Sequence, residues 1–226
     1  GIDATAPRTA REKAGLLRDA ELKTVVQAEQ LKNPDCTVSL ELEASQKFLA
    51  EYADSWQGLV TTDNNRYVRF FWEIRRVQRC WEYFVSSPSK TGDWVGRELI
   101  IKWDKEQGPL HFEGKAHNFP PRSALSKPGV LLSQVRNFYV TLYSGEIFND
   151  GSVPIIPKDK SLVPALYAYC QASEFTQAVR AVTQALRVTN GYFLKIPFDL
   201  EYWQKVAAEK YPNGLPEPYS DDPTQW

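Results

Sequence analysis

The chain of 226 residues contains no methionine, only two histidines and only three cysteines. Cys36, Cys80 and Cys170 are far apart and form no C-x-x-C pair, and His111 and His117 lack the spacing of zinc ligands. Neither a disulfide framework nor a zinc site is therefore expected. Because unpaired cysteines are typical of a reducing compartment, we expect a cytoplasmic protein.

The sequence has no signal peptide and no long apolar run, so no membrane partner is expected. Its net charge is close to zero, at −1 from 27 basic and 28 acidic residues. A domain that binds nucleic acid by itself usually carries a basic patch and a high isoelectric point. Any DNA binding must therefore depend on locally clustered Arg and Lys residues, or on another domain that contacts the phosphates.

The common enzyme motifs are missing as well. There is no G-x-G-x-x-G turn, no G-x-x-x-x-G-K-[ST] loop and no G-x-S-x-G elbow, which excludes the usual nucleotide sites and serine nucleophiles. The segment "HNFPPR" (117–122) is similar to the Asn-Pro-Pro-aromatic loop of amino-directed DNA methyltransferases, but Phe119 interrupts it and Arg122 replaces the aromatic residue. We expect no catalytic residue, cofactor site or metal site in this chain.

Hydrophobic residues make up 42% of the chain and aromatic residues 13%, which is enough for a substantial core. Periodicity predicts a helix over 8–33, an alternating strand at 36–43 and helix at 44–57. Short strands are predicted in "RYVRFFWEI", "ELIIKW", "PLHFEG", "GVLLSQV" and "FYVTLYSGEIF", and again in "GYFLKIPFDL" (191–200). Helices are predicted over 161–188 and in "EYWQKVAAEKY" (201–211).

Strands followed by helices, without regular alternation, predict the α+β class. We expect a mixed, largely antiparallel sheet with an N-terminal helix and a C-terminal helix pair. The predicted organisation is an N-terminal helical segment (1–35), a central domain (36–200), and a C-terminal helix with a proline-rich tail (201–226). Because the sequence begins at Gly1 and ends on "DDPTQW", we expect it to be a piece of a longer protein.

One metal-dependent alternative remains open. The segment "WDKEQGPLHFEGK" places Asp104, Glu113 and Lys115 in the D…E-x-K order of Mg²⁺-dependent nucleases, in which the acidic pair holds the metal. The two carboxylates would have to converge across a hairpin around "QGP". The other interpretation, which we favour, is a solvated hairpin without a metal.

Six segments, taken in order, carry a resemblance to a known family. They are "QLKNPDC", "GLVTTDNNRYVRFFWE", "GRELIIKW", "FYVTLYSGEIFNDG", "RVTNGYFLKIPFDLEYW" and "YPNGLPEPYSDDPTQW". The set resembles the region downstream of the catalytic domain in large adenine-specific DNA methyltransferases, namely type IIG restriction–modification enzymes and PglX-like phage-defence enzymes. The resemblance covers about residues 36–226. The sequence departs from it at Thr62, where the family usually has the glycine of "TGDN".

The resemblance implies a target-recognition domain that binds double-stranded DNA and has no activity alone. It also implies an upstream methyltransferase domain in the same parent chain, which would hold S-adenosylmethionine and the catalytic Asn-Pro-Pro-aromatic loop. No cofactor is implied for the present chain. A different alternative is a protein-interaction module that docks onto a methylase or helicase through the N-terminal helix.

Base recognition in DNA uses Arg or Lys for guanine and Asn or Gln for adenine. Asn64, Asn65, Arg66 and Arg69 offer this chemistry, and Asn65, Tyr67 and Arg69 would share one face of an early strand. The alternative is an Asx-turn at Asp63 and Asn64 with solvated arginines. Further candidates for contact with bases or phosphates lie in three later loops: Lys90, Trp94, Arg97, Arg122, Lys127, Gln134, Arg136 and Asn137. We expect Trp72, Trp81, Trp94 and Trp103 to belong mainly to the core, and among them Trp94 to be the exposed stacking residue.

Overall fold

The computed structural model describes residues 7–22, 24–31, 47–75, 80–104, 108–135 and 137–217. The chain divides into two compact units, Gly1–Gln46 and Lys47–Trp226. Helices and mainly antiparallel sheets occur together, which confirms the predicted α+β class. Within the described residues, none of the helices has the length and hydropathy needed to cross a bilayer.

The N-terminal unit contains α1 (Ala10–Asp19) and α2 (Gln27–Gln30). A capping box starts α1: the Glu12 N–H donates to the Thr9 hydroxyl, and the Glu12 carboxylate accepts from the Thr9 N–H. The helix ends at Asp19, so the continuous helix predicted over 8–33 is wrong. It buries no side chain, and the following Thr24-Val25-Val26 run has low helix propensity without packing to offset it. The strand predicted at 36–43 falls outside the described residues.

The first sheet of the larger unit has the order β1-β10-β7-β8 and is antiparallel throughout. Every residue of its two central strands, β7 and β10, is buried. The sheet strands are β1 (Ala53–Asp54), β7 (Gly129–Ser133), β8 (Val140–Tyr143) and β10 (Ser152–Pro157). Its helices are α5 (Val163–Gln171), α6 (Ser173–Val182), α7 (Asn190–Phe193) and α8 (Leu200–Lys210).

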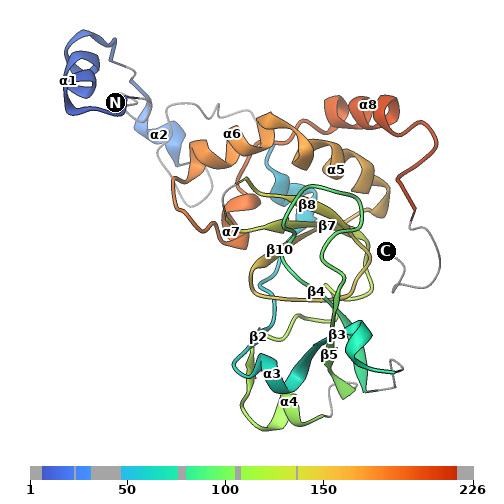
Figure 1. The fold of residues 1–226 in the computed structure, drawn as a ribbon. Coiled ribbons are helices and arrows are strands. Elements are labelled where there is room, and N and C mark those ends of the chain that lie inside the picture. Colours follow the sequence, from blue (N-terminus) through green and yellow to red (C-terminus); the bar gives the residue numbers. More distant parts are fainter. Residues whose placement is uncertain are drawn as a thin grey trace. The chain divides into compact units, whose positions relative to one another are not determined.

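Helix α5 lies between this sheet and α8, which explains why seven of its residues are buried (Figure 1). Leu166 packs in one cluster with Val130 and Val153 of the sheet and with Trp203 of α8. Apolar side chains on all sides of a helix are typical of one enclosed by other elements. This layer is the main hydrophobic core of the molecule.

The second sheet has the order β3-β5-β4-β9, with a parallel pair only between β4 and β9. Figure 1 shows it with α3 and α4 at the end of the unit opposite α5 and α8. Its strands are β3 (Val68–Phe70), β4 (Trp81–Val85), β5 (Leu99–Lys102) and β9 (Ile147–Phe148). Beside it lie α3 (Asn64–Tyr67), α4 (Pro109–Phe112) and the two-stranded ribbon of β2 (Val60–Thr61) and β6 (Ala116–His117).

A buried cluster joins the two sheets. Val85 and Phe148 of the second sheet pack with Leu131, Tyr143 and Ile156 of the first. The predicted single mixed sheet is therefore two four-stranded sheets and a ribbon, tied together by apolar contacts.

Several local predictions differ from the structure. "PLHFEG" forms the helical turn α4 and no strand, because Pro109 follows Gly108 at the first helical position. "GYFLKIPFDL" begins with helix α7, and its apolar residues Phe193, Ile196 and Phe198 join the main core without pairing in a strand ladder. The helix predicted at 44–57 is reduced, within the described residues, to the 3₁₀ turn Leu49–Glu51 followed by β1. Short apolar runs do not distinguish a buried helical turn from a strand.

Gly58 packs closely against the β9–β10 turn. A Cβ atom there would lie 1.9 Å from the Asn149 carbonyl oxygen. We predict that Gly58→Ala lowers the free energy of unfolding by about 1–3 kcal/mol, because backbone must shift to relieve the overlap. Urea unfolding measures the change. The control is Gly191→Ala in α7, where no atom lies within 4 Å of the added methyl group, and equal effects of the two substitutions would contradict the prediction.

Candidate nucleic-acid interface

The segment 58–74 begins as a strand and turns into a helix. Thr61 ends β2, and Thr62 then donates to the Lys115 carbonyl through its backbone N–H (2.9 Å) and its hydroxyl (3.2 Å). Thr62 is not among the non-glycine residues with positive φ, so this position does not need a glycine here. The Asp63 carbonyl then accepts from the N–H groups of Arg66 and Tyr67, which closes helix α3.

The predicted strand "RYVRFFWEI" is therefore confirmed only at Val68–Phe70, between α3 and the 3₁₀ turn Phe71–Glu73. Asn64 and Asn65 lie on a helical turn, whereas Arg69 lies on β3. The shared strand face predicted for Asn65, Tyr67 and Arg69 is wrong for this reason. Tyr67 is buried, while both asparagines are exposed.

A three-residue cluster joins α3 to the end of α4. Arg66 donates to both carboxylate oxygens of Glu113, at 2.6 and 3.1 Å, and the Tyr67 hydroxyl donates to the same carboxylate at 3.0 Å. The hydrogen bonds from Tyr67 and Arg66 lower the pKa of Glu113. Burial, together with the bond to Glu113, raises the pKa of Tyr67.

This Arg66–Glu113–Tyr67 cluster bears on two sequence hypotheses. Arg66 was a candidate for contact with guanine, and its guanidinium is instead held in a bidentate ion pair. Glu113 was a candidate metal ligand, and both of its oxygens accept hydrogen bonds from protein donors. Helix α4 also occupies the place of the hairpin expected between Asp104 and Glu113. Within the described ranges, no three His, Cys, Asp or Glu residues lie together as a metal site.

An open groove of about 610 Å³ lies between α3–β3 and the turn that connects β9 to β10. Asn64, Asn65 and Arg69 line it, so the structure brings together three of the four candidates from this segment. The remaining lining includes apolar side chains and the turn residues: Leu59, Thr61, Val68, Phe70, Glu73, Phe84, Leu99, Asn149 and Asp150.

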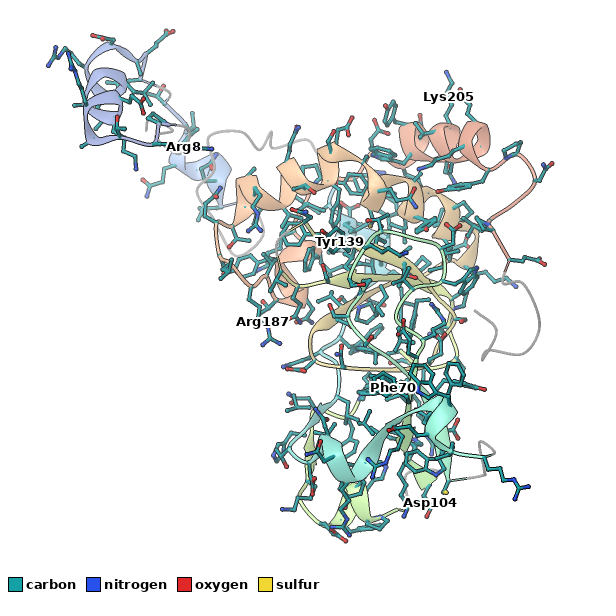
Figure 2. The ribbon with its side chains drawn as sticks, viewed as in Figure 1. Arg8, Phe70, Asp104, Tyr139, Arg187 and Lys205 are labelled. Atoms are coloured by element: carbon teal, nitrogen blue, oxygen red, sulfur yellow. The ribbon has the colours of Figure 1, made fainter. Side chains whose placement is uncertain are left out.

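Two aromatic rings are exposed beside the groove. Phe70 and Trp72 stack with their centroids 4.5 Å apart and their planes 12° apart, and they are 43% and 59% exposed. Figure 2 labels Phe70 on the part of the unit that carries β3. The expectation that Trp72 belongs to the core is therefore wrong. The sequence contains a sign of this exposure: Phe70, Phe71 and Trp72 are consecutive, and three consecutive aromatic side chains cannot all face one core.

The charges around the groove balance one another. Arg69 donates through Nη1 to the carbonyls of Asn65 and Val68, which fixes its guanidinium against the backbone. The Glu73 carboxylate accepts from the Phe70 N–H at 2.8 Å. Asp150 pairs with Arg187 at 3.1 Å. The groove thus offers hydrogen-bonding groups without an excess of positive charge.

The loop 86–97 has a structural role. Arg97 is buried: it pairs with Glu146 at 2.8 Å and donates to the Leu142 carbonyl, so it does not present its charge to solvent as predicted. Trp94 is half-buried, donates its indole N–H to the Pro216 carbonyl and lies against the Arg97 guanidinium. Trp94, which the sequence predicts to be the exposed stacking residue, is therefore not exposed.

The other candidates are spread over the surface. Lys90, Arg122 and Lys127 are exposed, with Arg122 and Lys127 lining two further hollows. Gln134 is buried and accepts a hydrogen bond from Arg187, whereas Asn137 is exposed and donates to the Tyr139 hydroxyl. Arg136 lies outside the described residues. None of these residues lines the groove beside α3.

No protein-family model matches the chain. No curated protein matches it either. Among solved structures, it is similar to the HsdS subunit from Thermoanaerobacter tengcongensis, with a TM-score of 0.38 and 14% identity. The match covers 88% of this chain and 43% of that subunit, so the chain spans less than half of the subunit's length.

We predict that Glu113→Gln destabilises the protein more at neutral pH than at acid pH. The pKa of Glu113 is depressed in the folded state, so its contribution is present above the unfolded value near 4.5 and is lost as the pH falls through the folded value. The difference between the urea midpoints of wild type and variant should be smaller at pH 3 than at pH 7. Glu209→Gln, on the exposed side of α8, is the control. A difference between wild type and Glu113→Gln that is independent of pH would contradict the prediction.

Arg97 and Glu146 form a buried ion pair. We predict that Glu146→Ala lowers the free energy of unfolding by about 3–5 kcal/mol, because Arg97 then stays buried without the Glu146 carboxylate. The matched control is Asp150→Ala, which removes the carboxylate of the exposed pair with Arg187 and should cost about 0–1 kcal/mol. Thermal or urea unfolding measures both values. If the two substitutions have equal effects, the structural role of Arg97 is refuted.

Proposed function

We propose that this chain is the DNA target-recognition part of an adenine-specific DNA methyltransferase from a restriction or phage-defence system. The observation that supports this most directly is the groove beside α3, where two exposed carboxamides, Asn64 and Asn65, lie next to Arg69 and the Phe70–Trp72 stack. Side chains of these types hydrogen-bond to base edges and stack on bases. The six segments that resemble the methyltransferase family point to the same role.

In this proposal the chain has no catalytic activity of its own. An upstream domain of the same parent would bind S-adenosylmethionine, transfer the methyl group and make most of the phosphate contacts. This division agrees with the net charge of −1 and with the balanced charges of the groove. Base contacts specify a sequence, whereas phosphate contacts supply most of the affinity and its salt dependence.

A second candidate is a docking module for another protein, favoured by the apolar surface of the N-terminal unit. Leu17, Leu22, Val26 and Leu31 are 57–68% exposed. Exposed apolar clusters are typical of protein–protein contacts. A DNA titration separates this candidate from the first.

We expect the chain to bind duplex DNA weakly at low salt, with a shallow decrease as salt rises. Arg69→Ala should weaken binding by about 1 kcal/mol or more, since it removes a donor from the groove and releases the backbone that carries Asn65. The control is Lys205→Ala, which also removes one positive charge but lies on α8, far from Phe70 in Figure 2. It should leave DNA binding unchanged. Fluorescence anisotropy gives the affinities, and circular dichroism checks the fold.

Failure of the wild-type chain to bind duplex DNA at any salt concentration would refute the proposed function and favour the docking module. Equal losses for Arg69→Ala and Lys205→Ala would place the DNA contact outside the groove.

A further inference from the structure

The hydrogen-bonding groups left available in the groove select one kind of base. The guanidinium of Arg66 is held by Glu113, and Nη1 of Arg69 is held by two backbone carbonyls. The carboxamides of Asn64 and Asn65 are exposed. The groove therefore exposes two carboxamides, which suit adenine, beside an arginine whose Nη1 is already occupied by the backbone.

Thr61 fixes the orientation of one of these amides. Its hydroxyl accepts from the Asp63 N–H at 3.3 Å and donates to the Asn64 Oδ1 at 3.1 Å. The Asn64 NH₂ group is therefore directed away from Thr61, while Oδ1 keeps one lone pair for a second donor. A carbonyl acceptor and an NH₂ donor are held side by side, so less ordering is needed when a ligand binds.

This arrangement matches adenine. An asparagine carboxamide accepts from the N6 amino group of adenine and donates to N7, whereas guanine presents two acceptors on the same edge. The apolar side chains of Leu59, Val68, Phe84 and Leu99 form part of the lining. We infer that the groove beside α3 binds an adenine base of the DNA target, with Asn64 as the specificity-determining residue and Thr61 as its positioning residue. The inference rests on the proposed function.

Two sources present the same adenine edge: a base pair read in the major groove, and a base that is unstacked or single-stranded. The experiment therefore uses two randomised oligonucleotide pools, one double-stranded and one single-stranded. The intact chain selects bound molecules from each pool, and sequencing gives the base preference at each position. The pool that shows the preference identifies the source.

The decisive variant is Asn64→Asp, which keeps the size of the side chain and replaces the NH₂ donor with an acceptor. Aspartate accepts from the N4 amino group of cytosine. We expect wild type to enrich adenine at one position by about ten- to a hundredfold, and Asn64→Asp to lose this preference there, with cytosine gaining. Asn213→Asp makes the same chemical change in the exposed turn after α8 and should behave as wild type.

Thr61→Val removes the hydroxyl that orients Asn64 and should reduce the adenine preference while total binding persists. A merely structural role for Asn64 would reduce all binding and shift no base preference. If wild type enriches a sequence but Asn64→Asp leaves every position unchanged, the adenine inference is overturned and the proposed function stands. If wild type does not bind the double-stranded pool, the proposed function fails, and if it binds neither pool, the adenine inference fails with it.

Discussion

The arrangement of the candidate interface depends on one carboxylate. Glu113 accepts from Arg66 and Tyr67, residues 47 and 46 positions earlier in the chain, and so ties helix α3 to helix α4. This contact fixes the helical turn whose first two residues are Asn64 and Asn65. It also withdraws Arg66 and Glu113 from the two roles that the sequence suggests for them. An ion pair with exposed partners contributes little stability, so its main effect is to orient the turn.

The balanced charge of the groove limits what it can do alone. Arg69 and Glu73 line it together, and Asp150 is paired with Arg187. Such a surface contributes little of the counterion release that drives non-specific DNA binding. It can still discriminate between bases, because discrimination comes from hydrogen bonds at base edges. A recognition domain in a larger enzyme is expected to supply the selectivity, while another domain of the enzyme supplies most of the affinity.

The sequence predicted the α+β class and the positions of β5, β7, β8 and α8, since these elements have clear periodicity and turn residues. It misplaced α4 and α7, where a proline or the main core decides between helix and strand. It correctly predicted that Asn64, Asn65 and Arg69 lie near one another, because they are within five positions of each other in the chain. The partners of Arg66, Trp94 and Arg97 were beyond prediction, since Glu113, Pro216 and Glu146 lie 47–122 residues away in the chain.

Amide hydrogen exchange with and without duplex DNA tests the central claim most directly. Exchange reports protection residue by residue and needs no substitution that might disturb the fold. If the groove beside α3 is the contact surface, DNA should slow exchange in residues 59–73 and in the β9–β10 turn around Asn149. Protection confined to other segments, such as the loop 86–97, or no protection at all under conditions of measured binding, would contradict it.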